Sequence, residues 1–147
     1  MEPHANLAYL IHHVATLLER QAEKLLQERF AIGFSQFKIL MALKWKTNVQ
    51  QRQIADSLGQ TEASVSRQIK MLQEQGLLAN RISPENRRQR IISLTAKGDK
   101  LAQAAMTSLT NYQQTLFAGM GDVQRSDITT GLQIIHRQLC QTGACGS

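Results

Sequence analysis

Apolar side chains recur every three or four residues along most of this sequence, which is the spacing of one face of a helix. The first such stretch runs from Leu7 to Phe30 without a glycine or a proline. It predicts a long amphipathic helix whose apolar face needs a partner. We expect Gly33 to end this helix and Ser35 to cap a second one. That second helix carries Phe37, Leu40, Met41, Leu43 and Trp45.

Two shorter helices are predicted next, separated by a tight turn. The first points Ile54, Ala55 and Leu58 inward, and Gly59 ends it. Thr61 can cap the second, which ends at Gly76. The inward residues of the second helix are Val65, Ile69 and Leu72.

A β-hairpin is predicted after these helices. Residues 78–82 and 91–94 are dense in apolar and β-branched side chains, and a polar loop with a proline near its start joins them. The loop region carries three arginines within four residues, namely Arg87, Arg88 and Arg90. We therefore expect a hairpin with a strongly basic tip.

The last third of the chain predicts two more helices. Thr95 can cap a long one, residues 119–121 interrupt the pattern, and the final helix follows. One face of the final helix carries Ile128, Leu132, Ile135 and Leu139. The predicted fold is therefore mainly α with a small β-hairpin.

Residues 50–95 have the order of a winged helix-turn-helix, in which the second helix enters a DNA groove and the hairpin forms the wing. Hydroxyl groups and cations on the outer face of that helix can bond phosphates or base edges. An ordinary amphipathic helix with a solvated polar face remains the alternative for this helix taken alone. The arginine-bearing hairpin favours DNA, because arginines suit a narrow minor groove. The predicted DNA-binding residues are Ser64, Ser66, Arg67, Lys70, Arg87, Arg88 and Arg90.

The charge distribution agrees with a nucleic-acid partner. The 147 residues have a formal net charge of +6 and a pI of about 9.8. Between Arg52 and Lys100 nine basic and five acidic residues leave +4, whereas residues 1–30 have a net charge of −1. A basic balance alone fits nucleic acid or an anionic membrane surface, and its concentration in the predicted winged unit favours nucleic acid.

The sequence resembles the multiple-antibiotic-resistance regulator (MarR) family over nearly its whole length. The resemblance is sharpest at residues 54–58, 64–67, 72–78 and 91–98, where the wing ends in Leu94-Thr95 and Gly98 follows one turn into the next helix. It implies a homodimer with interlocked terminal helices, two recognition helices in successive major grooves, and wings in the flanking minor grooves. It also implies repression of nearby genes, relieved by a small, often phenolic ligand or by cysteine oxidation.

The resemblance also implies roles for individual residues. Arg88 matches the arginine at the wing tip that contacts the minor groove. Asn86 stands where the family often has aspartate; it removes a carboxylate that could hold an arginine but still accepts a hydrogen bond. The ligand cavity implied by the family lies between the dimerisation helices and the DNA-binding unit, with His12, Phe37 and Met41 as candidate lining residues. Core packing explains Phe37 and Met41 equally well.

The apolar stripes of the first and last two helices independently favour a homodimer, because the central unit is too small to cover them. We therefore predict a single domain over residues 1–147. Within it, residues 5–33 and 96–141 form dimerisation helices, and residues 35–95 form the winged helix-turn-helix. Two-fold symmetry predicts a pseudo-palindromic operator of double-stranded DNA.

Other chemistry is absent from the sequence pattern. There is no phosphate-binding glycine loop, no His-Glu-x-x-His motif and no nucleophile elbow, so we predict no enzymatic activity, cofactor or metal. We expect no secretory signal or membrane span and a reduced, cytoplasmic protein. Two alternatives stay open. One is a redox-sensing regulator that uses Cys140 and Cys145; the other is a winged-helix adaptor that binds protein instead of DNA.

Overall fold

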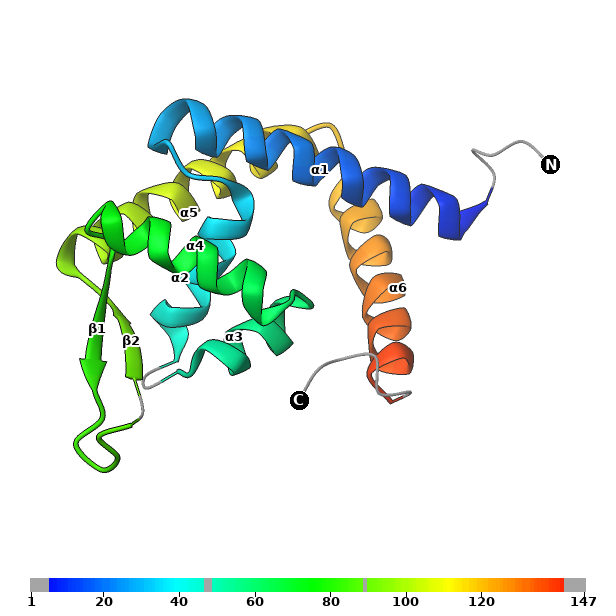
Figure 1. The fold of residues 1–147 in the computed structure, drawn as a ribbon. Helices are drawn as coiled ribbons and strands as arrows, with labels where there is room; N and C mark the ends of the chain where they lie inside the picture. The colour runs from blue at the N-terminus through cyan, green and yellow to red at the C-terminus, as the bar shows by residue number, and fades with distance from the viewer. Residues whose placement is uncertain (1–5, 47–48, 89, 142–147) are drawn as a thin grey trace.

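The computed structural model describes the chain except for residues 1–5, 47–48, 89 and 142–147. Helices α1 and α5 lie side by side, and α6 turns away from the end of α5 (Figure 1). The helix-turn-helix and the hairpin occupy the other end of the molecule. In chain order the elements are α1 (Leu7–Phe30), α2 (Phe34–Trp45), α3 (Gln51–Leu58), α4 (Glu62–Glu74), β1 (Leu78–Ile82), β2 (Arg90–Leu94), α5 (Ala96–Phe117) and α6 (Asp122–Gln141).

The hydrophobic core lies around α2, which packs against α1, α3, α4 and α5. Burying a large aliphatic side chain contributes about 1.5–3 kcal/mol, so these residues hold the helices around α2 together. The largest side chains that are fully buried are Leu26, Ile32, Ile39, Leu40, Ile54, Leu72, Leu77 and Val65. The inward faces predicted for the two helices of the helix-turn-helix are confirmed, with Leu58 only half-buried.

The α1–α2 junction differs from the prediction. α1 ends at Phe30, and its C-cap Ala31 adopts the left-handed conformation with φ of 54°. Gly33 is the N-cap of α2, and Ser35 lies inside the first turn. The expected roles of both residues were therefore wrong. Two other side chains cap α2: the Glu23 carboxylate of α1 accepts from Phe34 N–H, and Gln36 Oε1, in the first turn of α2, accepts from Gly33 N–H at 3.0 Å.

The local signals in the helix-turn-helix are confirmed. Gly59 ends α3 with φ of 61°, and Thr61 Oγ1 accepts from Ser64 N–H at 3.2 Å to cap α4. Gly76, with φ of 73°, follows α4. A positive φ carries a steric penalty for residues with a Cβ, which explains glycine at both positions.

The hairpin pairs Leu78–Ile82 with Arg90–Leu94 in antiparallel register, so β2 begins one residue before the predicted strand. Val49, just before α3, adds an isolated bridge to Ile92 and ties the wing base to the helix-turn-helix.

The start of α5 is tightly joined to the end of α4. Thr95 Oγ1 accepts from Gly98 N–H at 3.0 Å, which confirms the predicted cap, and donates to Gly76 O at 2.7 Å. Thr95 N–H donates to Leu77 O at 3.1 Å, and Lys97 Nζ donates to Gln75 O at 2.8 Å. These bonds clamp the two ends of the hairpin together, so the wing leaves the helices from a fixed base.

Candidate nucleic-acid interface

Helix α4 presents a polar face opposite a buried stripe. Val65, Ile69 and Leu72 are buried, whereas Ser66, Arg67 and Lys70 are exposed. No carboxylate pairs with either cation in the described part of the chain. The two cations are therefore available to an anionic partner at the surface of the predicted recognition helix.

Ser64 lies differently from the other predicted contacts on α4. It is half-buried, and its Oγ accepts a hydrogen bond from Gln68 Nε2 at 3.2 Å. Since a hydroxyl has one hydrogen and two lone pairs, Ser64 can still donate its hydrogen to another group. Gln68 is not among the predicted DNA-binding residues.

The three wing arginines predicted to bind DNA are all exposed. Arg87 and Arg88 lie in the loop, and Arg90 begins β2. None of them pairs with a carboxylate among the residues that the structure describes. The wing and α4 are thus both cationic and exposed, and both extend from the base that Thr95 clamps.

Two polar side chains shape the wing loop. Asn86 Oδ1 accepts from Arg88 N–H at 3.1 Å, and buried Ser83 accepts from Glu85 N–H at 3.3 Å. Asparagine thus supplies the acceptor that the sequence analysis expected it to keep. It does so without adding a negative charge near the arginines.

Glu62, in the first turn of α4, faces Arg52 of α3. Arg52 Nε lies 3.9 Å from Glu62 Oε1, and both side chains are exposed. An exposed pair of this kind contributes only about 0–1 kcal/mol, so DNA phosphates can compete for Arg52. Arg52 adds a cation to this surface that the sequence analysis did not assign to it. In the sequence, Arg52 could have been found from its position in the first turn of the first helix of the helix-turn-helix.

Residues 34–89, from the first turn of α2 to the wing loop, match the model described as the MarR family. The winged helix-turn-helix unit of this chain is therefore similar to the MarR family. This match agrees with the DNA-binding transcriptional regulator that the sequence predicts.

Similar proteins are found both by sequence and by fold. The uncharacterised HTH-type transcriptional regulator YwoH of Bacillus subtilis is 27% identical over 117 residues, which cover 78% of this chain and 84% of YwoH. The structure of a Staphylococcus aureus MepR–DNA complex has a TM-score of 0.74 and 23% identity, covering 91% of this chain and 96% of that one. CouR of Rhodococcus jostii RHA1, bound to p-coumaroyl-CoA, has a TM-score of 0.78 and 20% identity, covering 92% and 94%. The predicted winged helix-turn-helix fold is confirmed.

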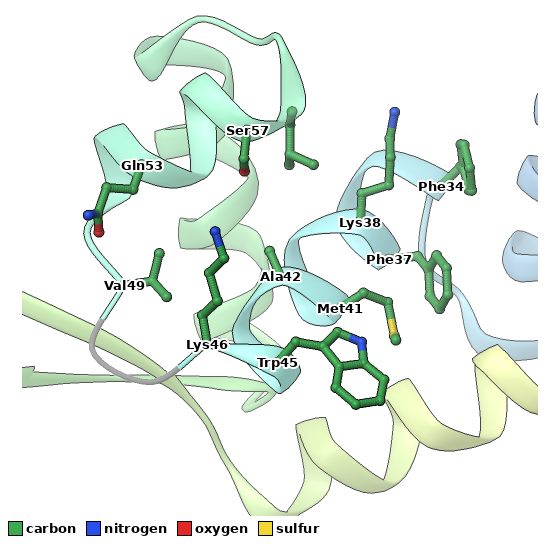
Figure 2. Close-up of a pocket in the computed structure, with 11 residues that line it drawn as sticks. Phe34, Phe37, Lys38, Met41, Ala42, Trp45, Lys46, Val49, Gln53 and Ser57 are labelled. Carbon is green, nitrogen blue, oxygen red and sulfur yellow. The ribbon is translucent and has the colours of Figure 1, made fainter. Parts of the chain in front are cut away.

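A pocket of about 840 Å³ lies along the outer face of α2. Phe37, Met41 and Trp45 follow one another along the helix at its wall, and Lys38 and Lys46 border it (Figure 2). Trp45, grouped with the apolar residues of this helix in the sequence analysis, is 71% exposed. Residues of α3 complete the lining.

The pocket brings together two of the three predicted ligand residues. Phe37 and Met41 line it, whereas His12 lies exposed on α1 and is not a lining residue. The ligand role predicted for His12 therefore has no support from this geometry.

The predicted redox pair lies only partly within the described residues. Cys140, in α6, is bonded in a disulfide, and its Sγ lies 3.6 Å from His136 Nε2. Cys145 lies outside the described residues. No helix in the described ranges is long and apolar enough to cross a membrane.

Proposed function

We propose that this chain is a homodimeric repressor that binds a pseudo-palindromic operator and releases it when a small aromatic ligand binds. The observation that carries the DNA-binding part is the exposed cationic surface of α4 and the wing. Arg67 and Lys70 on the helix, and Arg87, Arg88 and Arg90 on the wing, have no carboxylate partner among the described residues.

Each part of this surface suits one groove. The major groove admits an α-helix, so α4 enters it with Ser66, Arg67 and Lys70 toward bases and phosphates. The minor groove is narrow and strongly negative where the sequence is rich in A·T pairs, and it attracts inserted arginines. The wing places Arg88 there, with Arg87 and Arg90 beside it. The complex of MepR with DNA supports DNA binding by a protein of this fold.

The dimer rests on apolar surface outside the DNA-binding unit. α6 buries no residue within the chain, and α1 buries residues only in its second half. Large apolar side chains left exposed on α1 and α6 are Leu7, Leu10, Val14, Leu17, Val123, Ile128, Leu132, Ile134 and Leu139. Exposed apolar side chains in this number on two helices are typical of an interface. A second copy covers it and sets two α4 helices about 34–36 Å apart, one turn of DNA.

We expect tight binding to duplex DNA from immediately upstream of the gene that encodes this chain, resisting unrelated competitor DNA. Arg88→Ala is expected to weaken this binding by about 1–3 kcal/mol, because one minor-groove contact is lost. The measurement is a fluorescence-anisotropy titration at two salt concentrations. The wild-type affinity should fall steeply with salt, since cations of the surface displace counterions from the phosphates.

Arg20→Ala is the matched control, because it removes the same charge from the exposed face of α1. Equal losses in both variants would mean that only net charge matters and would remove the wing from the mechanism. Binding that competitor abolishes would contradict sequence-specific recognition of this DNA. No binding at low salt would favour the adaptor hypothesis.

The ligand part of the proposal rests on the α2 pocket. Its wall is aromatic and apolar, which suits a planar ring, and its two lysines suit an acidic substituent on that ring. CouR, a structure of the same fold, holds a ligand that includes an aromatic acyl group. The pocket touches both α2 and α3, so an occupant can shift α3 and with it the helix-turn-helix.

Trp45 is the only tryptophan of the chain, so its fluorescence reports on this pocket directly. Titration with 4-hydroxybenzoate is expected to give a saturable change in this fluorescence and to weaken DNA binding over the same concentration range. Met41→Glu should abolish both effects, while Met71→Glu, an exposed position on α4, should leave the fluorescence change intact. A fluorescence change without any effect on DNA affinity would contradict ligand control.

A further inference from the structure

Gln68 lies on the flank of α4, between its buried stripe and its exposed face. Both hydrogens of its amide are used: Gln68 Nε2 donates to Gln60 Oε1 at 3.1 Å and to Ser64 Oγ at 3.2 Å. Gln60, in the turn of the helix-turn-helix, donates in its turn from Nε2 to Ser35 Oγ in α2. The four side chains form one chain of hydrogen bonds from α2 to the first turns of α4.

The same glutamine is unfavourable for packing. Its Oε1 is buried, and no group among the described residues donates to it. A buried acceptor without a partner destabilises the folded state, whereas leucine has a similar size and no polar atom. Stability alone therefore does not account for glutamine at position 68. What distinguishes it from leucine is the pair of bonds that its Nε2 donates.

Those two bonds have a consequence at the DNA-facing surface. The bond from Gln68 occupies a lone pair of Ser64 Oγ, so the Ser64 hydroxyl hydrogen turns away from Gln68. Ser64 Oγ keeps its hydrogen and one lone pair, both directed away from Gln68. Held in this way, the hydroxyl meets a base edge in one geometry, either as a donor to N7 or O6 of guanine or O4 of thymine, or as an acceptor from the amino group of cytosine or adenine. Without Gln68 the hydroxyl rotates freely, and its two remaining bonds lose their fixed directions.

We infer that Gln68 is a positioning residue for sequence recognition: it fixes the orientation of the Ser64 hydroxyl and ties the first turns of α4 to α2 through Gln60 and Ser35. This inference rests on the proposed function, in which α4 enters the major groove. It assigns Gln68 an effect on discrimination between bases, and not on the general affinity for DNA.

The test compares Gln68→Leu with Gln73→Leu. Gln73 lies on the same helix and has a buried Nε2 without a partner, but it takes no part in the hydrogen-bond chain. The probe is the duplex that the wild-type protein selects from a randomised library, together with all of its single-base-pair variants. Affinities are measured for each duplex at several salt concentrations, and melting temperatures are measured for each protein.

Gln68→Leu is expected to lose about three- to tenfold of discrimination at one base pair of each half-site, the equivalent of one hydrogen bond. Its melting temperature should change little, since the unpaired acceptor is removed together with the two donated bonds, and its salt slope should be unchanged, since no cation is removed. Gln73→Leu should keep full discrimination. Ser35→Ala, which keeps Gln68 but cuts the chain at α2, should show a smaller loss at the same base pair.

Two results separate the failure of this inference from the failure of the proposed function. If the wild-type protein selects no sequence, the proposed function fails and the inference fails with it. If the wild-type protein selects a sequence and Gln68→Leu discriminates equally well, only the inference is overturned. An equal loss in Gln68→Leu and Gln73→Leu would also overturn it, because the effect would then belong to helix packing.

Discussion

Gly98→Ala is expected to destabilise the protein by about 3 kcal/mol, the upper end of what overpacking usually costs. A Cβ at this position would lie 2.0 Å from the carbonyl oxygen of Leu77. Backbone cannot move aside as a flexible side chain can, so α5 or the start of the hairpin must shift. The same oxygen accepts from Thr95 N–H, and that bond would be strained or lost as well.

Gly98→Ala is expected to lower stability even though alanine has the higher helix propensity. Gly98 lies in the first turn of α5, and alanine is favoured over glycine inside helices by about 0.5–1 kcal/mol. The steric clash with Leu77 costs more than this preference contributes, so the substitution is destabilising. For a domain of this size, about 3 kcal/mol lowers the melting temperature by roughly 6–12 °C, which circular dichroism measures easily.

Gly119→Ala is the matched control for this prediction. A Cβ at Gly119, between α5 and α6, meets nothing within 4 Å, and the residue is not among those with positive φ. This substitution should be neutral or slightly stabilising, because it restricts the unfolded chain. If Gly98→Ala melted like Gly119→Ala, the close approach of α5 to Leu77 would not exist in solution.

Gly98 also shows what the sequence could and could not predict. Its place one turn into the helix was part of the family resemblance, but no local pattern gives the reason for glycine there. The reason is a contact with backbone 21 residues earlier, which only the folded chain displays. Thr61, Thr95, Gly59 and Gly76 were predicted with their roles, because caps and left-handed turns are decided within a few residues.

The prediction for the α1–α2 junction was wrong because local rules allowed two answers. Gly33 and Ser35 both fit local capping rules, and the choice between them depends on Glu23, which reaches Phe34 N–H from the preceding helix. Periodicity also assigned Trp45 to the apolar residues of its helix without showing that it stays exposed beside a pocket. Local sequence signals predicted the helices and strands. Contacts between these elements determine the cap of α2 and the exposure of Trp45.

Some residues of the candidate site could likewise be predicted from the sequence, and others could not. The exposed cations of α4 and the wing were predicted because charge and hydroxyl groups opposite an apolar stripe are visible in the sequence. Gln68 was missed because its partners lie in α2 and in the turn, and a glutamine on a helix flank carries no signal of its own. The predicted lining residue His12 was placed from an implied cavity, and the α2 pocket does not include it.

The double variant Ile128→Glu with Leu132→Glu is expected to turn the protein into a monomer and to lower operator affinity by a factor of about 10² or more. Both residues are exposed on α6, 53% and 46% respectively, and lie one turn apart on the face that also carries Ile135 and Leu139. Two carboxylates cannot be buried there without partners, so the proposed interface with a second copy cannot form. A monomer then binds each half-site independently and loses the gain from simultaneous contact.

Light scattering after size exclusion measures the first effect, with the mass falling from twice the 16.5 kDa chain to a single chain. Anisotropy with the complete operator and with a single half-site measures the second. The variant should bind the two duplexes with similar affinity, whereas the wild-type protein should strongly prefer the complete operator. This comparison separates loss of the dimer from loss of the DNA-binding unit.

Thr130→Glu with Gln133→Glu is the matched control, since it adds the same two charges to α6 on the side away from Ile128 and Leu132. It should remain a dimer with wild-type preference for the complete operator, apart from a small loss from added repulsion of phosphate. If this control also became a monomer, the interface would not follow the apolar face of α6. A dimeric Ile128→Glu, Leu132→Glu variant would place the interface elsewhere, and the exposed apolar stripe of α6 would then need another explanation.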